Sequence, residues 1–384
     1  MKLKANFFSA VAMLVGTVIG VGMFGIPYVI SKVGFGVGFL YLLILGIMVT
    51  ITTLAFGEII LRTKGHHQMT GYAKKYAGIW GQRTVAFSLI FGVFGATLAY
   101  TIGIGNFLAI VFKPYFGGTP FLYSLIFYIL ASIALLFGMR VIEKLENLMV
   151  FLLLLIVGFV IIIGVREISL TNFIGLGIGS LFLPYGVILF SYEGASTIPG
   201  MVDLLAKNKR RLKIAIIFGM IIAFLVYLFF SFVIVGISGD QTSEEAIVGV
   251  SKILGRKIVV AGAILGILAV ATSFFSLGMT MKDMFQFDYK IKNIWAWVIT
   301  VTIPLIIFVL GARSFIAVIE IVGTVTGGLQ GIMILRMFLK AKKIGQLKPA
   351  YSLRLPKFLI YILYIIFGGG IVYQIFYNVV AKFN

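Results

Sequence analysis

Long runs of apolar residues, each separated from the next by a short polar segment, follow one another along the chain. A helix that crosses a bilayer needs about 20 predominantly apolar residues. The runs are continuous rather than alternating, which argues against a membrane β-barrel. The pattern therefore predicts eleven transmembrane helices, segments 1 to 11. They span residues 7–31, 37–61, 84–112, 121–138, 147–165, 178–204, 213–237, 257–283, 294–311, 314–339 and 356–380.

Composition indicates a polytopic membrane protein and excludes a soluble one. Hydrophobic residues make up 61% of the chain and charged residues 11%, against roughly 25% charged in an ordinary soluble domain. The absence of cysteine excludes disulfides and thiolate-bound metals. The only histidines, His66 and His67, are interpreted as solvated loop residues, because no further metal ligand lies near them in the sequence. The first apolar run lacks a small-residue cleavage site, so no cleavable signal peptide is expected.

The basic residues predict the orientation of the chain. With the N-terminus inside, 24 of the 32 Lys and Arg fall in inner loops and 8 on the outer side, a strong positive-inside asymmetry. The net charge of +20 therefore points to anionic inner lipids rather than to nucleic acid. We expect a multi-pass plasma-membrane protein with a cytoplasmic N-terminus and an external C-terminus. The inner loop 62–82 is expected to hold a short amphipathic helix capped by Thr70, and the outer loop 238–256 another short helix.

Segment 1 carries a glycine-rich interruption near its middle. The motif GTVIGVGMFGIP, residues 16–27, places four glycines before Pro27, which weakens the helix. At Gly22 the missing side chain would let the backbone face a ligand. The glycine spacing also favours close helix packing, so packing alone remains an alternative. A dinucleotide fingerprint is rejected, because no strand precedes the motif.

Segment 6 carries a matching interruption that includes an acid. The motif SLFLPYGVILFSYEGASTIPG, residues 180–200, places Glu193 between two prolines. A carboxylate at this depth is costly unless it is paired or protonated, which favours a functional role. The alternative is a protonated side chain bonded to a neighbouring carbonyl. Interrupted helices in matching positions of two halves point to a transporter site, where freed carbonyls bind a cation and half-helix N-termini an anion. An amino acid supplies both charges.

Segment 8 offers oxygen ligands for a cation. In ILAVATSFFSLGMTMKDMF, residues 267–285, Ala269, Thr272 and Ser273 share one helical face. Two hydroxyls together with carbonyls of an unwound partner helix would form an all-oxygen pocket for a hard monovalent cation. Alternatively, these hydroxyls bond carbonyls of their own helix or join two helices.

These motifs resemble the amino acid–polyamine–organocation superfamily with the LeuT-type 5+5 inverted repeat. The chain is most similar to the amino acid/auxin permeases and the hydroxy/aromatic amino acid permeases. The resemblance rests on the segment 1 motif, LAYTIGIGNFL (98–108), FSYEGAS in segment 6 and ATSFFSLGMTMKDMF in segment 8. It covers segments 1 to 10. It implies an all-α membrane protein with helices 1 and 6 broken at the midplane, a first repeat over 1–170, a second over 171–345 and an extra helix within 346–384.

The resemblance also implies roles for the matching residues. The two breaks would hold the substrate's carboxylate and amine, and Tyr100, near mid-depth in segment 3, should line the site. Sodium-coupled relatives bind the ion between segments 1 and 8. The implied substrate-binding residues are Val18, Gly20, Val21, Gly22, Tyr100, Phe190, Ser191 and Glu193. The implied sodium ligands are the carbonyls of Gly16, Ile19 and Ala269 and the hydroxyls of Thr272 and Ser273.

Two departures refine this picture. Some proton-coupled relatives place a lysine of segment 5 in the ion site, and segment 5 has no basic residue at that depth, which favours sodium. Proton coupling through Glu193 stays the alternative. Neurotransmitter-type relatives have an arginine soon after the segment 1 break. Here that position is Ile26, so the outer gate is expected to be apolar or aromatic.

Two further acids are candidates for gating or proton transfer. Glu58, near the inner end of segment 2, is expected to pair with Arg62 one turn later; an inner-gate role is the alternative. Glu320, in the outer half of segment 10, is expected either to face an aqueous vestibule or to relay protons.

The sequence therefore predicts a symporter that imports a neutral, apolar or aromatic, amino acid with sodium by alternating access. A proton-coupled permease and a transporter-like nutrient sensor remain alternatives. A membrane enzyme is disfavoured, because no His–Asp cluster, metal motif or activated Ser is present. A divalent-metal transporter would need Asp or Asn in the segment 1 break. This break has neither, so that class is also disfavoured. No organic cofactor, nucleic acid or required protein partner is expected; the partners are the amino acid and the bilayer.

Overall fold

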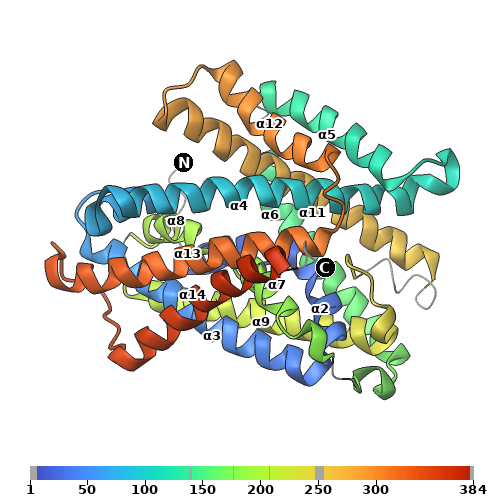
Figure 1. Ribbon diagram of the computed structural model, residues 1–384, viewed down its shortest axis with the longest axis horizontal. Coiled ribbons are helices and arrows are strands. Elements are labelled where there is room, and N and C mark those ends of the chain that lie inside the picture. The colour runs from blue at the N-terminus through green and yellow to red at the C-terminus, as the bar shows by residue number, and fades with distance from the viewer. Residues whose placement is uncertain (1–6, 138–140, 176, 207, 247–254, 381–384) are drawn as a thin grey trace.

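The computed structural model describes residues 7–137, 141–175, 177–206, 208–246 and 255–380, which are all-helical and contain no strand (Figure 1). This confirms the all-α prediction. The longer helices are α1 (Phe7–Val18), α2 (Ile26–Val33), α3 (Phe35–Arg62), α4 (Met69–Phe116), α5 (Pro120–Phe137), α6 (Val141–Gly164), α7 (Leu183–Ser191), α8 (Ile198–Leu204), α9 (Arg211–Ser238), α11 (Arg256–Asp283), α12 (Asn293–Val309), α13 (Phe315–Ile344) and α14 (Lys357–Val380). The short turns are η1 (Val21–Phe24), η2 (Val165–Glu167), η3 (Leu170–Phe173), η4 (Ile178–Ser180), η5 (Ala195–Thr197), η6 (Gly239–Gln241) and η7 (Met284–Asp288).

Seven of the described helices are long and apolar enough to cross a membrane, and the bent pair formed by α1 and η1–α2 makes an eighth candidate. Such helices suit a bilayer because they satisfy every backbone polar group internally. Each of the eleven expected segments overlaps a helix. The count of eleven membrane spans goes beyond these seven or eight candidates and stays a prediction.

The two long helices α4 and α13 pack against each other through the middle of the molecule. In Figure 1, α4 and α13 lie side by side along the long axis. Helix α13 also packs against α3, α7 and α14, and α11 packs against α4 and α6. Helix α9 packs against α1, α2 and α3. The short helices α1, α2 and α7 are thus held from several sides by long ones, and the candidate site lies among them.

The loop 62–82 differs from the expectation. Helix α4 begins at Met69 with Gln68 at the N-cap position, so the prediction that Thr70 caps a separate short helix is wrong. Instead the helix runs on into segment 3 through a bend at Gly78, whose backbone has φ 72°. A glycine adopts this left-handed conformation without strain, and the bend therefore joins two helices that the sequence pattern separates.

The loop 238–256 docks onto two helices. Of the expected short helix, residues 247–254 lie outside the described residues. The preceding turn places Glu244 over the start of α13, where it accepts hydrogen bonds from the Ser314 hydroxyl and from the backbone N–H of Ile316. Glu245 is buried and accepts a hydrogen bond from Asn106 of α4. The loop thereby connects α4 to α13 at this end of the molecule.

Candidate functional site

The first helix break lies between α1 and α2. Helix α1 ends at Val18, Gly20 is extended with φ −113° and ψ −158°, and a 3₁₀ turn follows before α2. Pro27 sits in the first turn of α2, where the missing N–H costs nothing. The axis of the helical arm Val21–Val33 is bent by 53° away from the axis of α1. Carbonyl oxygens at the end of α1 are consequently free of helical partners.

The second break lies between α7 and α8. Helix α7 ends at Ser191, Gly194 has non-helical angles of φ −154° and ψ 1°, and α8 resumes at Ile198 with Pro199 in its first turn. Glu193 lies in this interruption, where its backbone N–H donates to the carbonyl of Phe190 at 3.3 Å. Both interruptions therefore have glycine where the helix stops and proline where it restarts.

The two breaks touch each other. A Cβ placed on Gly22 would lie 2.6 Å from Ser191 Oγ and 3.0 Å from Phe190 Cδ1. A Cβ placed on Gly194 would lie 2.6 Å from Val18 Cγ2. Side chains of ordinary size cannot fit at these glycines. The structure thus brings together predicted substrate-binding residues that are more than 160 positions apart in the sequence.

A buried tyrosine, Tyr227, links the two breaks, and it was not predicted from the sequence. The Tyr227 hydroxyl on α9 lies 2.6 Å from the carbonyl oxygen of Val18 and 2.7 Å from that of Ser191, the last residues of α1 and α7. A hydroxyl donates only one proton, and the Val18 carbonyl also accepts from the backbone N–H of Gly20 at 2.8 Å, so the Ser191 carbonyl loses this donor when the hydroxyl bonds Val18. Both oxygens mark negative helix C-termini. Their convergence creates an electron-rich point that suits a positively charged group.

Aromatic and apolar side chains pack around the first break. The Phe24 ring lies 5.4 Å from Phe107 of α4 and 6.0 Å from Phe230 of α9, both edge to face. Ile26 is fully buried, and a Cβ on Gly25 would lie 2.7 Å from Ile319 Cδ1. These contacts surround the first break with apolar and aromatic side chains, and the apolar or aromatic outer gate stays a prediction.

Of the expected ion ligands, Gly16 lies in α1, Ile19 lies between α1 and η1, and the other three lie in α11, which packs against η1. The Thr272 hydroxyl donates within its own helix, 3.0 Å from the carbonyls of both Leu268 and Ala269. Its oxygen keeps lone pairs for an ion. Ile19 is buried and its N–H still bonds Val15, whereas Ser273 is half-buried. Tyr100 is buried in α4.

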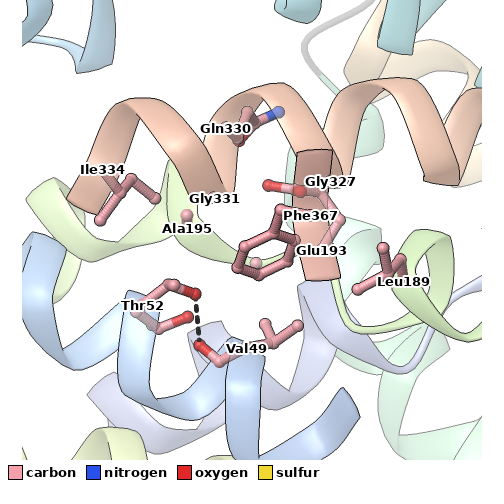
Figure 2. A pocket seen from close by; sticks show the side chains of 12 residues that line it. Val49, Thr52, Leu189, Glu193, Ala195, Gly327, Gln330, Gly331, Ile334 and Phe367 are labelled. Carbon is pink, nitrogen blue, oxygen red and sulfur yellow. Dashed lines mark hydrogen bonds between the residues drawn. The ribbon is translucent and has the colours of Figure 1, made fainter. Parts of the chain in front are cut away.

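A separate cavity lies beside the second break, between α3, α7, α13 and α14 (Figure 2). Its volume of about 20 Å³ is close to that of one water, so an amino acid does not fit in it. Glu193 lines this cavity, and the other predicted substrate-binding residues do not. The remaining lining residues are Val49, Thr52, Thr53, Leu189, Gly194, Ala195, Gly327, Gln330, Gly331, Ile334 and Phe367.

Comparison with known proteins decides the family. The model of the tryptophan/tyrosine permease family matches residues 3–376. The chain belongs to this family. It is 25% identical to glutamine transporter 2 of Aliivibrio fischeri over 83% of this chain and 85% of that protein. It is 22% identical to tyrosine-specific transport system 1 of Haemophilus influenzae over 71% of each chain. It is 25% identical to the low affinity tryptophan permease of Escherichia coli over 76% of this chain and 75% of that protein.

The fold has a counterpart of known structure. Mhp1, a nucleobase-cation-symport-1 family transporter in a closed conformation with bromovinylhydantoin bound, aligns with a TM-score of 0.61 at 13% sequence identity. The alignment covers 88% of this chain and 79% of that chain. Family and fold together confirm the resemblance to the amino acid–polyamine–organocation superfamily. The chain is a permease-type amino acid transporter with the LeuT fold.

In this permease, Glu58 forms the expected ion pair. Its fully buried carboxylate lies 2.8 Å from the Arg62 guanidinium. It also accepts hydrogen bonds from the Ser352 hydroxyl at 3.0 Å and from the backbone N–H of Leu353. The pair therefore anchors the segment between α13 and α14 to the end of α3, a connection that the sequence pattern did not indicate.

Glu320 does not face an aqueous vestibule, so that interpretation is wrong. Glu320 is 8% exposed, and its carboxyl group accepts a hydrogen bond from Gln374 of α14. A Cβ on Gly186 of α7 would collide with the Glu320 carbonyl oxygen. Helix α7 thus packs closely against the backbone of α13 at this residue. Proton relay through Glu320 stays a prediction.

His66 is solvated, as expected, whereas His67 is half-buried with its ring edge to face against Tyr72 at 5.4 Å. His66 Nε2 lies 2.6 Å from a carboxylate oxygen of Asp203 on α8, and both side chains are more than half exposed. Within the described residues, no group of three or more His, Asp or Glu could hold a metal ion. The contact between His66 and Asp203 links the turn before α4 to α8.

Proposed function

We propose that this permease is a secondary active symporter that imports a neutral, apolar or aromatic, amino acid together with sodium by alternating access. The observation that carries the proposal is the convergence of the Val18 and Ser191 carbonyls on one point, held by Tyr227. A substrate ammonium group has three donors and a positive charge, which matches two helix C-termini. The relatives named for tryptophan, tyrosine and glutamine transport support a neutral substrate.

The surroundings of the breaks favour an uncharged side chain on the substrate. Phe24, Phe107 and Phe230 pack at one end. The substrate's amine and carboxylate would be held by the backbone of Val18, Gly20, Val21 and Gly22 and of Phe190 to Glu193, with Tyr100 alongside. Helices 1 and 6 would each cross the membrane as a broken span. The two repeats 1–170 and 171–345, the extra helix within 346–384, the eleven spans and the external C-terminus belong to this proposal.

For coupling, sodium would bind between segments 1 and 8. Its ligands would be the carbonyls of Gly16, Ile19 and Ala269 and the hydroxyls of Thr272 and Ser273. The contact of α11 with η1, the turn that begins two residues after Ile19, supports this placement. An ion there would tie α11 to the arm that touches the substrate, so the sodium and substrate affinities would raise each other by the same factor.

Proton coupling through Glu193 is the second candidate. Within the described residues, the ion pairs join Glu58 to Arg62 and Asp203 to His66, and none involves Glu193. Glu193 is half-buried; a carboxylate withdrawn from water without a countercharge is costly, and a proton would neutralise it.

Counterflow in proteoliposomes tests both the substrate and the ion. Preloaded vesicles are challenged with each of the twenty amino acids, and sodium and pH gradients are varied separately. Sodium coupling predicts that Thr272→Ala with Ser273→Ala removes sodium stimulation, while Glu193→Gln keeps some sodium-dependent uptake. Proton coupling predicts that Glu193→Gln stops gradient-driven uptake but spares exchange. Exchange of none of the twenty amino acids would reject the proposed function.

A further inference from the structure

Helix α4 is too long to lie wholly within a bilayer. It has 48 residues, whereas about 20 suffice to cross the hydrocarbon core. Residues 84–112 contain no Asp, Glu, Lys or Arg and can form the part that crosses. The start of α4, up to Arg83, therefore lies at the membrane surface or beyond it.

Protein contacts hold the first part of α4, residues 69–77, in place. Tyr72 is 1% exposed, and its ring packs edge to face on Phe56 of α3 at 5.7 Å between ring centres. The apolar side of this part is thus used within the protein. Lys74 and Lys75 remain exposed on it. Their backbone is fixed by packing, so a ligand that binds them does not have to order a loose loop.

An exposed tryptophan and an arginine follow the bend at Gly78. Trp80 is 73% exposed, and the Arg83 guanidinium lies 5.4 Å from the centre of its ring. Phe87, on the same helical face, is 55% exposed. Along this face the order is cation, amphipathic aromatic and then apolar aromatic. The same order of surroundings is met on going from the headgroups of a bilayer into its acyl chains.

A second exposed tryptophan lies at the same end of the molecule. The Phe94 ring of α4 lies 6.5 Å from that of Phe285, just after α11, and a Cβ on Gly266 would lie 2.7 Å from Phe107. Helices α4 and α11 therefore run antiparallel, and the start of α12 lies near the start of α4. Trp295, near the start of α12, is 60% exposed. Exposed tryptophans at one end of the helices indicate the level of the lipid headgroups.

The cations at the start of α4 have no carboxylate partner among the described residues. Both ion pairs of those residues lie elsewhere, at Glu58 and Asp203. Lys75 donates to the neutral side-chain oxygen of Gln346 at 2.7 Å. A phosphate group would supply the missing negative charge and accept charge-assisted hydrogen bonds. A phospholipid fits better than a free anion, because the exposed aromatic residues continue this surface toward the hydrocarbon core.

We propose that this surface, formed by Lys74, Lys75, Trp80 and Arg83, binds an anionic phospholipid. The cations attract the headgroup phosphate, Trp80 lies at the level of the glycerol backbone, and the acyl chains lie along Phe87. A zwitterionic lipid is disfavoured, because its own cationic group offsets the attraction. This binding does not depend on which amino acid or coupling ion is carried.

Quenching of Trp80 fluorescence by brominated lipids tests the site. The other tryptophans of the chain are Trp295 and Trp297, so Trp295→Phe with Trp297→Phe leaves Trp80 as the single reporter. This protein is reconstituted in mixtures of phosphatidylcholine and phosphatidylglycerol in which one lipid is brominated, and the quenching gives their relative affinity. Phosphatidylglycerol should be preferred. Lys74→Gln with Arg83→Gln should lower the preference by about 25-fold, because each cation near the surface contributes about fivefold.

Two further variants separate this surface from net charge and from folding. Lys209→Gln with Arg210→Gln removes one exposed lysine and one exposed arginine between α8 and α9, where no tryptophan lies, and should keep most of the preference. Lys74→Arg with Arg83→Lys keeps both charges and should also keep it. All variants are compared by elution profile and by thermal unfolding.

Three results would overturn the proposal. The first is equal quenching by the two brominated lipids in the protein whose single tryptophan is Trp80. The second is an equal loss of preference in the variant of Lys74 and Arg83 and in the variant of Lys209 and Arg210, which would show an effect of net charge alone. The third is reversal of the quenching by inorganic phosphate at constant ionic strength, which would indicate a site for a free anion.

Discussion

Tyr227 has a single hydroxyl proton but contacts two carbonyl oxygens, those of Val18 and Ser191. This residue holds the ends of α1 and α7 at a fixed separation. When it bonds Val18, whose carbonyl also accepts from the Gly20 N–H, the Ser191 carbonyl can accept a hydrogen bond from a ligand. A lone tyrosine in the apolar run IIAFLVYLFFSF could have been flagged from the sequence, because buried tyrosines usually bond a partner. The identity of that partner depends on tertiary packing, which the pattern does not contain.

Tyr227→Phe is expected to weaken substrate binding. Leaving a buried acceptor without its donor costs about 1–3 kcal/mol, so the KM for substrate should rise by about tenfold. Tyr128→Phe is the matched control, because its hydroxyl donates to one buried carbonyl, that of Val301, between α5 and α12. Uptake kinetics in proteoliposomes should show a raised KM only for Tyr227→Phe. Equal KM values in the two variants would contradict this role.

Gly22 and Gly20 provide a second comparison at the residue scale. Gly22→Ala places a Cβ 2.6 Å from Ser191 Oγ and 3.1 Å from Ser191 Cα, so the two breaks must separate. Gly20→Ala meets only Thr17 O at 3.7 Å, and its φ of −113° suits any residue. We expect Gly22→Ala to lose most uptake and Gly20→Ala to keep most of it, at similar amounts of protein in the membrane. Equal uptake by both variants would place the site elsewhere.

At the scale of the elements, the connections between the apolar helices differ most from what the sequence predicted. The apolar pattern located the helices well, because burial in lipid or protein governs them. It could not show that α4 continues through Gly78, since a single glycine decides between a bend and a break. It also could not show that the segment after α13 docks on Glu58, because polar contacts between distant loops have no periodic signal.

The docked loop around Glu244 and Glu245 should respond to pH. Burial raises the pKa of Glu245 to about 7, and the neighbouring Glu244 acts in the same direction. The docked loop thus holds a proton that a released loop would give up. Docking should be strongest below the ordinary carboxyl pKa of 4.5 and should weaken as the pH rises toward 7.

Cysteine labelling measures this docking. The chain has no native cysteine, so Gln241→Cys provides one exposed reporter in the loop. The maleimide labelling rate, divided by the rate in a Glu245→Gln background, should increase between about pH 5 and pH 7. The division removes the intrinsic pH dependence of the thiol. A constant ratio across this range would contradict the proposed dependence on Glu245.

The two ion pairs should differ in their contribution to stability. Glu58 is fully buried, so Glu58→Gln leaves Arg62 without its partner and should cost about 3 kcal/mol. Asp203→Asn also removes one carboxylate charge, but from a pair that is more than half exposed, and should cost about 1 kcal/mol or less. Thermal unfolding in detergent should therefore show a clearly lower midpoint only for Glu58→Gln. Similar midpoints would show that the Glu58 pair does not anchor α3.

At the scale of the whole molecule, the sequence predicted the all-helical fold and the superfamily. The glycine and proline motifs identified the interruptions because both residues disfavour helix locally. The cavity lined by Gln330 was not predicted. It forms only because four helices meet there and because small residues of α13 and of the break after α7 leave space. The burial of Glu320 was likewise set by the approach of α7 and α14 to α13.

The central claim is that the two breaks couple a neutral amino acid to an ion gradient. It is tested most directly by accumulation of labelled tryptophan in proteoliposomes under an inward sodium gradient at equal pH on both sides. We predict that the internal concentration transiently exceeds the external one and that this excess disappears when sodium is equilibrated. Tryptophan that only equilibrates under both a sodium gradient and a proton gradient, with the same result for tyrosine and glutamine, would contradict the account.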